Sequence, residues 1–295
     1  MAPGAARGGA AEHRRRGIHG GPSEWPLRSV MSAIRVSAVE YLNARPLVHG
    51  LGARSDLFEL QYDVPARCAA QLHEKSVDLG LIPSIEYLQF SDYSIVPDLA
   101  VASEGDVASV ALFTTRPATS LRSIAVDSSS RTAAALVRVL CTEWWDIDPK
   151  LVKLRPELDV MLKRCDAALV IGDQALHLDY ESQGLDKVDL GDEWTAMTSL
   201  PFVWAVWAGR NGAIGPEHVA ALQQARDAGV ATVNEIVAAH GPEDEEAQEV
   251  GRTYLRENVS FSLDERALAG LRKFYDYAYD LRLVQTPPRI RFFEP

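Results

Sequence analysis

From Ile34 onward the chain alternates short apolar runs, which fit buried strands, with segments that fit helices. A first strand is expected at 34–39 and a second at 59–64; a helix then opens at Pro65, and a third strand is expected at 78–83. A strand, a helix and a strand in this order predict parallel pairing with right-handed crossovers. The alternation therefore constrains the chain to an α/β fold.

A second series of the same kind begins after a strand expected at 107–115. It contains apolar runs at 123–127 and 167–172, and a run at 202–207 returns the chain before a helical C-terminal part. Two α/β units joined by two crossing segments predict two lobes, each with a mixed, mostly parallel sheet flanked by helices. We expect lobe one with the C-terminal helices at 34–114 and 202–295, and lobe two at 115–201.

Three polar segments follow predicted strands, at 41–46, at Pro83-Ser84 and at 128–132. In open α/β sheets, ligands bind beyond the carboxyl ends of strands, and helix N-termini there bind anions. We therefore expect these segments to meet at a cleft between the lobes.

The net charge of the chain is −11, but its first thirty residues carry five Arg and two Glu, a net +3. The rest carries −14, which disfavours a nucleic-acid partner because like charges repel. An anionic ligand must then be held by local donors. Residues 1–30 are rich in Gly, Ala and Arg and lack the apolar core of a secretory signal, so we expect a disordered leader.

The three cysteines, Cys68, Cys141 and Cys165, lie far apart and form no CxxC pair, which indicates reduced thiols in a cytoplasmic protein. No apolar run reaches the ~18 residues of a membrane span, so we expect no membrane partner.

The chain has no GxGxxG, Walker or HExxH motif, so no cofactor and no metal are expected. An apolar helix face at 216–239 fits either the core or a homodimer interface, and the oligomeric state stays open.

Several short motifs stand in a fixed order along the chain. They are Tyr41 to Leu47, Leu81 to Tyr87, Gly105 to Val110, Asp127 to Thr132, Asp166 to Leu176, Asp189 to Gly191 with Trp194, and Leu200 to Ala205. This ordered set resembles the motifs of the chorismate dehydratases, which open the futalosine route to menaquinone. The resemblance covers about residues 34–290 and implies a periplasmic-binding-protein type 2 fold. Each motif is weak alone, whereas the set is specific.

The resemblance implies a cofactor-free lyase that removes water from chorismate to give 3-[(1-carboxyvinyl)oxy]benzoate. The ring hydroxyl is lost together with the proton on the neighbouring carbon that bears the enolpyruvyl ether, and an aromatic ring remains. Because aromatisation supplies much of the driving force, orienting the dianion and stabilising the departing hydroxyl can suffice without a strong protein base. This chemistry agrees with cleft motifs that offer Asn, Ser and Thr rather than His.

The motifs and the expected cleft together indicate which residues form the site. We expect Asn43 and Ser109 to be catalytic, and we expect the substrate to be bound by Arg45, Pro83, Ser84, Ser129, Ser130, Arg131, Thr132, Gly172 and Asp173.

Each of these residue types also has an ordinary structural role. Asn43 can cap the helix near Pro46, and the Ser and Thr at 128–132 can simply begin a helix. Ser109 can satisfy a strand edge, and Arg131 can point to solvent.

Two alternative functions share the expected fold. The first is the 1,4-dihydroxy-6-naphthoate synthase of the same pathway, whose expected histidine base corresponds to Gly172 here, which counts against it. The second is a solute-binding protein for a small carboxylate, since fold does not decide function. Such a protein requires export, and no export signal is recognisable in residues 1–30.

Overall fold

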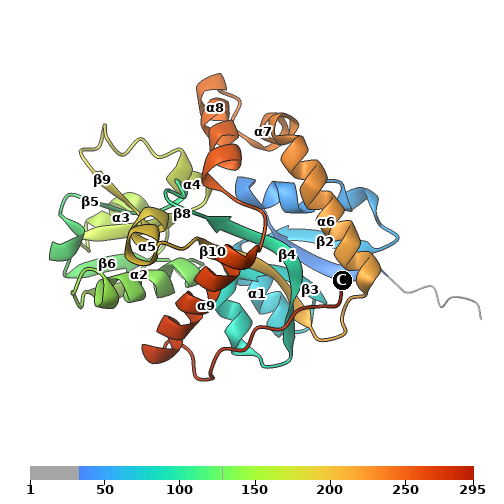
Figure 1. Cartoon of the computed structure of the whole chain (residues 1–295). Coiled ribbons are helices and arrows are strands. Elements are labelled where there is room, and N and C mark those ends of the chain that lie inside the picture. The colour runs from blue at the N-terminus through green and yellow to red at the C-terminus, as the bar shows by residue number, and fades with distance from the viewer. Residues whose placement is uncertain (1–32, 128) are drawn as a thin grey trace, which may run out of the picture. The chain divides into compact units, whose positions relative to one another are not determined.

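The computed structural model describes residues 33–127 and 129–295, which are drawn in colour in Figure 1. The predicted leader at 1–30 and Ser128 lie outside the described residues. The described part contains two five-stranded sheets with helices packed around them.

The first sheet combines three short strands from the start of the chain with two longer ones. Its order is β2 (Phe58–Asp63), β1 (Ile34–Val39), β3 (Leu79–Pro83), β10 (Phe202–Arg210) and β4 (Tyr93–Ser103). β1 pairs in parallel with β2 and β3, whereas β10 pairs antiparallel with β3 and β4. The helix α1 (Pro65–His73) connects β2 to β3 and begins with a proline, whose fixed φ suits the first helical turn.

The second sheet repeats this arrangement. Its order is β7 (Lys150–Lys153), β6 (Ser123–Val126), β8 (Ala167–Ile171), β5 (Val110–Thr114) and β9 (Asp186–Asp189). β6 pairs in parallel with β7 and β8, and β5 pairs antiparallel with β8 and β9. The helices α2 (Arg131–Glu143) and α3 (Leu158–Leu162) make the two crossovers between the parallel strands.

The expected α/β fold with two mixed, mostly parallel sheets is confirmed, because four of the five strands in each sheet run in the same direction. The exceptions are β10 in the first sheet and β5 in the second, the first strand after each crossing, and each runs antiparallel to both of its neighbours. β5 pairs in the second sheet, although the predicted boundary assigned residues up to 114 to lobe one. Its apolar sequence fits the centre of either sheet, so the strand pattern alone did not assign it. The chain therefore crosses at residues 104–109, and the division into two lobes around this crossing stays a prediction.

The C-terminal part is helical. It contains α6 (Pro216–Ala231), α7 (Val233–His240), α8 (Glu245–Thr253), a π-helical turn η5 (Tyr254–Asn258) and α9 (Glu265–Asp280). Helix α6 packs tightly on the 3-10 helix η1 (Leu42–Val48): a methyl group on Gly229 would lie 2.3 Å from the carbonyl oxygen of Pro46. Among the described residues, no helix combines the length and the apolar character needed to cross a membrane.

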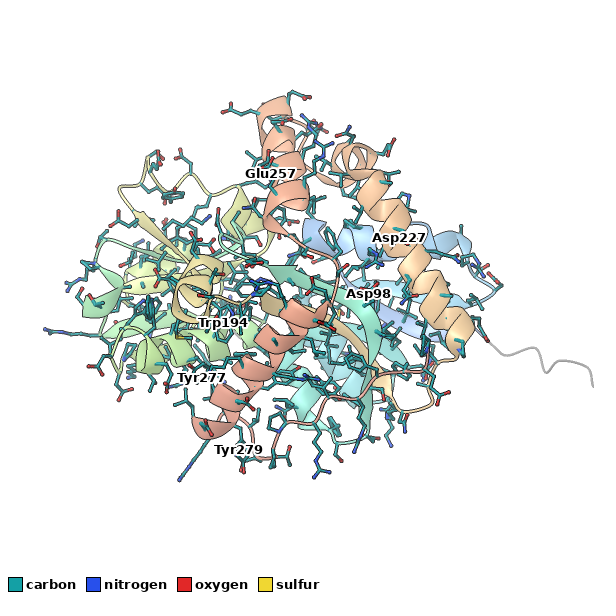
Figure 2. The ribbon with its side chains drawn as sticks, viewed as in Figure 1. Asp98, Trp194, Asp227, Glu257, Tyr277 and Tyr279 are labelled. Carbon is teal, nitrogen blue, oxygen red and sulfur yellow. The ribbon has the colours of Figure 1, made fainter. Side chains whose placement is uncertain are left out.

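An aromatic cluster joins the second sheet's last helix to the C-terminal part. Trp194 of α5 (Leu190–Thr198) is fully buried, and its ring centroid lies 5.1 Å from that of Phe202, 6.2 Å from Phe274 and 6.3 Å from Tyr277. Figure 2 shows Trp194 and Tyr277 near each other at this junction. Edge-to-face contacts of this kind add to the stability gained from burial alone, so the cluster stabilises the junction between α5, β10 and α9.

Candidate active site

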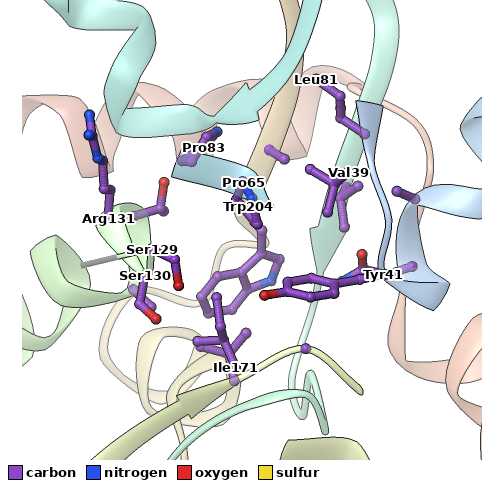
Figure 3. A pocket seen from close by; sticks show the side chains of 18 residues that line it. Val39, Tyr41, Pro65, Leu81, Pro83, Ser129, Ser130, Arg131, Ile171 and Trp204 are labelled. Carbon is purple, nitrogen blue, oxygen red and sulfur yellow. The ribbon is translucent and has the colours of Figure 1, made fainter. Parts of the chain in front are cut away.

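A cavity lies at the carboxyl ends of strands from both sheets. Val39 and Leu81 of the first sheet and Ile171 of the second form apolar walls, and the indole of Trp204 projects between them (Figure 3). All three segments that were expected to converge contribute to its lining. The contributing residues are Tyr41, Asn43, Ala44, Pro83 and Ser129 to Thr132.

Asn43 lines the cavity and does not act as a helix cap. The N-cap of η1 is Tyr41, whose side chain makes no capping hydrogen bond. The Asn43 Nδ2 instead donates a hydrogen bond to the hydroxyl oxygen of Tyr254, at 2.9 Å. The capping alternative therefore does not describe this residue, and its amide is held from behind by a buried tyrosine.

Ser109 is fully buried at the end of the crossing segment and is not part of the cavity lining. Its hydroxyl lies 2.7 Å from the hydroxyl of the same Tyr254. The two residues predicted to be catalytic thus share one hydrogen-bonding partner, and burial raises the pKa of that tyrosine far above its usual value.

The start of α2 presents three hydroxyl groups to the cavity. Ser129 donates to the Asp127 carboxylate, and Thr132 accepts from the backbone N–H of Ile85 at 3.3 Å, across the two sheets. The hydroxyl of Ser130 is buried and has no hydrogen-bonding partner among the described residues. A buried hydroxyl without a partner is costly, so this group is available for a ligand at a helix N-terminus, where anions are favoured.

Pro83 and Ser84 occupy the start of η3 (Ser84–Gln89) on the opposite wall. Pro83 lines the cavity, whereas Ser84 is fully buried and its hydroxyl lies 3.5 Å from that of Thr132. The carbonyl oxygen of Ser84 accepts a hydrogen bond from Tyr275 at 2.7 Å. The structure therefore brings Ser84 to the junction of the two sheets, behind the lining.

The backbone of Arg131 is at the cavity, but its guanidinium forms an ion pair. It donates to the buried Glu86 carboxylate at 2.7 Å, and His73 lies 2.8 Å from the same oxygen atom. Glu86 belongs to the first sheet's side and Arg131 to the second, so the pair joins the two. The sequence left the choice between substrate and solvent open for Arg131, and in the structure its charge is already neutralised.

Tyr41 and Trp204 are wall residues that the sequence analysis did not single out. Figure 3 shows the Tyr41 ring reaching in from one side and Ser129 and Ser130 from the other, with the indole of Trp204 between them. Burial, together with the nearby carboxylates of Asp127 and Asp173, raises the pKa of Tyr41 to about 12. Tyr41 is therefore a hydrogen-bond donor at neutral pH. Tyr41 follows β1 and Trp204 lies within β10, and an aromatic residue at either place carries no specific signal, so the sequence did not mark the two as site residues.

Gly172 follows β8 with φ 71° and ψ −154°, a conformation that is essentially restricted to glycine. Its Cα lies against the Tyr41 ring, because an added Cβ would be 2.9 Å from two of the ring carbons. Gly172 therefore lines the cavity and fixes how closely Tyr41 approaches the second sheet.

Arg45 and Asp173 face a second hollow rather than the cavity itself. Arg45 donates to the Glu40 carbonyl oxygen, and its guanidinium carbon lies 4.6 Å from the Tyr62 ring centroid. Asp173 accepts from the backbone N–H of Leu42 at 3.0 Å, and burial raises the pKa of its carboxyl above the usual range. The second hollow shares Tyr41, Ser129, Ser130 and Ile171 with the cavity.

These features define a class of protein: two α/β units enclose a small-molecule cavity between the carboxyl ends of their strands. Solved structures agree at the level of the fold. A protein from Archaeoglobus fulgidus has a TM-score of 0.69 at 19% identity and covers 86% of this chain and 99% of its own. The periplasmic aliphatic sulphonate-binding protein of Escherichia coli has a TM-score of 0.57 at 16% identity, with 90% and 92% covered.

Sequence comparison identifies the family. The model of the family described as menaquinone biosynthesis matches residues 34–280. The chorismate dehydratase of Thermus thermophilus is 31% identical over 257 residues, which covers 79% of this chain and 91% of that protein. This chain belongs to the menaquinone biosynthesis family.

Proposed function

We propose that this protein dehydrates chorismate to 3-[(1-carboxyvinyl)oxy]benzoate in menaquinone biosynthesis. The observation that carries the proposal is the cavity, which has hydroxyl and amide groups on both sides and no His, Lys, Asp or Glu among the described residues of its lining. The dehydratase from Thermus thermophilus supports the choice of substrate, because the match extends over most of both chains.

In the proposed reaction, the carbon–oxygen bond of the ring hydroxyl breaks, and the neighbouring carbon loses its proton. The electron pair of that carbon–hydrogen bond becomes the new double bond, and the hydroxyl leaves with a proton as water. The ring becomes aromatic, which supplies much of the driving force. The protein then has to orient the dianion and stabilise the departing oxygen with preorganised donors.

We assign the roles by position in the cavity. The Ser130 hydroxyl, the N–H groups at the start of α2 and the hydroxyl of Thr132 hold a carboxylate of the substrate. Asn43 holds a reacting oxygen through its amide. Tyr41, whose raised pKa keeps it protonated, donates to the departing hydroxyl. Trp204 provides a flat apolar face for the ring.

The remaining predicted residues support the cavity lining or lie next to the cavity. Ser84 supports Thr132, and Ser109 supports Asn43 through Tyr254. Arg45 and Asp173 line the neighbouring hollow, where the substrate enters. We also propose a cytoplasmic location, which is supported by three free, buried cysteines.

Incubation of the purified protein with chorismate tests the function. Loss of the diene absorbance with formation of the aromatic enol ether supports the proposal, and heat-unfolded protein serves as the control for spontaneous decay. Unchanged chorismate overturns the proposal. Tight binding without turnover points to the solute-binding alternative, whereas activity in the naphthoate-forming step points to the other enzyme of the pathway.

A further inference from the structure

A π-helical turn follows α8 and contacts the cavity from behind. In η5 (Tyr254–Asn258), the N–H of Val259 donates to the carbonyl oxygen of Tyr254, five residues earlier, at 3.2 Å. Turns of this kind are rare and are frequent at functional sites, because the extra residue re-aims a side chain. Here the first residue of the turn points inward, while Arg256 and Glu257 are exposed.

The inward residue, Tyr254, is only 1% exposed. Its hydroxyl oxygen accepts the Asn43 N–H at 2.9 Å and lies 2.7 Å from the Ser109 hydroxyl. Either hydroxyl can donate in the bond between Tyr254 and Ser109, whereas Asn43 gives one of its two N–H groups to the tyrosine oxygen. This bond leaves the amide oxygen and the second N–H of Asn43 for the cavity that Asn43 lines.

The other end of the turn holds the crossing segment. Asn258 Nδ2 donates to the carbonyl oxygen of Asp106 at 3.0 Å. The crossing segment contains Ala108 with φ 60°, a left-handed conformation that a non-glycine residue adopts only when its surroundings impose it. One π turn thus fixes the crossing segment at Asp106 and at Ser109.

We infer that Tyr254 is a positioning residue for the dehydration, which sets the orientation of the Asn43 amide and holds Ser109 through its hydroxyl. The inference rests on the proposed function. Tyr254 does not line the cavity and acts through Asn43, so its loss should affect the reaction step more than substrate binding.

The test is Tyr254→Phe, which keeps the buried ring and removes only the hydroxyl. Tyr87→Phe is the matched control, because Tyr87 is 2% exposed and its hydroxyl bonds backbone groups away from the cavity. We expect the single-turnover rate of Tyr254→Phe to fall by roughly 10-fold or more, with KM within about twofold, because small misplacements of reacting groups are costly. Tyr87→Phe should react at the unaltered rate with a similar change in melting temperature.

A mutant cycle separates positioning from a general loss of packing. In an Asn43→Ala, Ser109→Ala background, Tyr254→Phe should lower the rate by no more than about twofold, since groups that act as a unit are not additive. The same factor in both backgrounds would overturn the inference, as would Tyr254→Phe at the unaltered rate.

Two further outcomes are distinguishable. If Tyr254→Phe does not fold, Asn258→Ala removes the other contact of the turn, and a rate equal to that of the unaltered protein would then reject the positioning role. Absence of turnover in the unaltered protein would refute the proposed function itself, whereas an active unaltered protein with a fully active Tyr254→Phe refutes only the role of the tyrosine.

Discussion

Replacing Gly172 by alanine should destabilise the protein through two separable effects. The backbone conformation at Gly172 is essentially restricted to glycine. Any other residue in this conformation is strained, which lowers the free energy of unfolding by an amount on the order of 1–3 kcal/mol. The new methyl group would also lie 2.9 Å from two carbons of the Tyr41 ring, an overpacking that costs about 1–3 kcal/mol where the ring cannot shift. The free energy of unfolding should therefore fall by roughly 2–6 kcal/mol when both effects apply.

Urea denaturation at neutral pH measures this loss without reference to any activity. Gly50→Ala is the matched control, because Gly50 also has a positive φ of 74° but an added Cβ there meets nothing within 4 Å. In a Tyr41→Ala background, Gly172→Ala should retain the backbone cost and lose the contact cost. The reasoning fails if Gly172→Ala costs no more than Gly50→Ala, or if removing the Tyr41 ring leaves its cost unchanged.

Three further predictions concern single residues. Asn43→Ala should lower the single-turnover rate roughly 10²-fold, as loss of one preorganised donor does. The free energy of unfolding, measured with urea, should fall by only about 0.5–1.5 kcal/mol because one hydrogen bond is lost. A near-native rate would remove Asn43 from the mechanism. Thr132→Val leaves the N–H of Ile85 without its acceptor, so the free energy of unfolding should fall by about 1–3 kcal/mol and KM for chorismate should rise; an unchanged KM argues against its role. Burial raises the pKa of Cys68 to about 11 and that of Cys141 to about 12, so both thiols stay protonated near pH 8. Both should therefore react with an aromatic disulfide reagent only after the protein unfolds. Fast labelling of the folded protein would contradict this expectation.

The strands were predictable because their signal is local. The run at Ala167 to Ile171 is entirely apolar, as expected for a strand covered on both faces, and the run at Ile34 to Val39 is apolar except for Arg35 and Ser37; both strands are observed. The sequence did not show to which sheet β5 belongs, because β5 is as apolar as the central strands of either sheet. Its pairing with β8 and β9 assigns it to the second sheet.

The site was predictable where a residue type has a particular chemical use after a strand. Asn43, Pro83 and Ser129 to Thr132 line one cavity, whereas their roles in binding and catalysis stay predictions. The supporting contacts were not accessible from sequence. Asn43 and Tyr254 are 211 residues apart, and the tyrosine sits in a polar helical segment with no motif around it.

The ion pair between Arg131 and Glu86 also affects how substrate binding depends on ionic strength. With the guanidinium neutralised by a carboxylate that is 4% exposed, the described cavity lining carries no uncompensated formal charge for mobile ions to screen. The hydroxyl and N–H donors that remain act over a few ångströms, well within the Debye length of about 8 Å at physiological ionic strength. Salt should therefore act mainly through the strongly acidic surface of the protein. Screening of that surface should make a dianionic substrate associate faster and bind more tightly at high salt than at low salt.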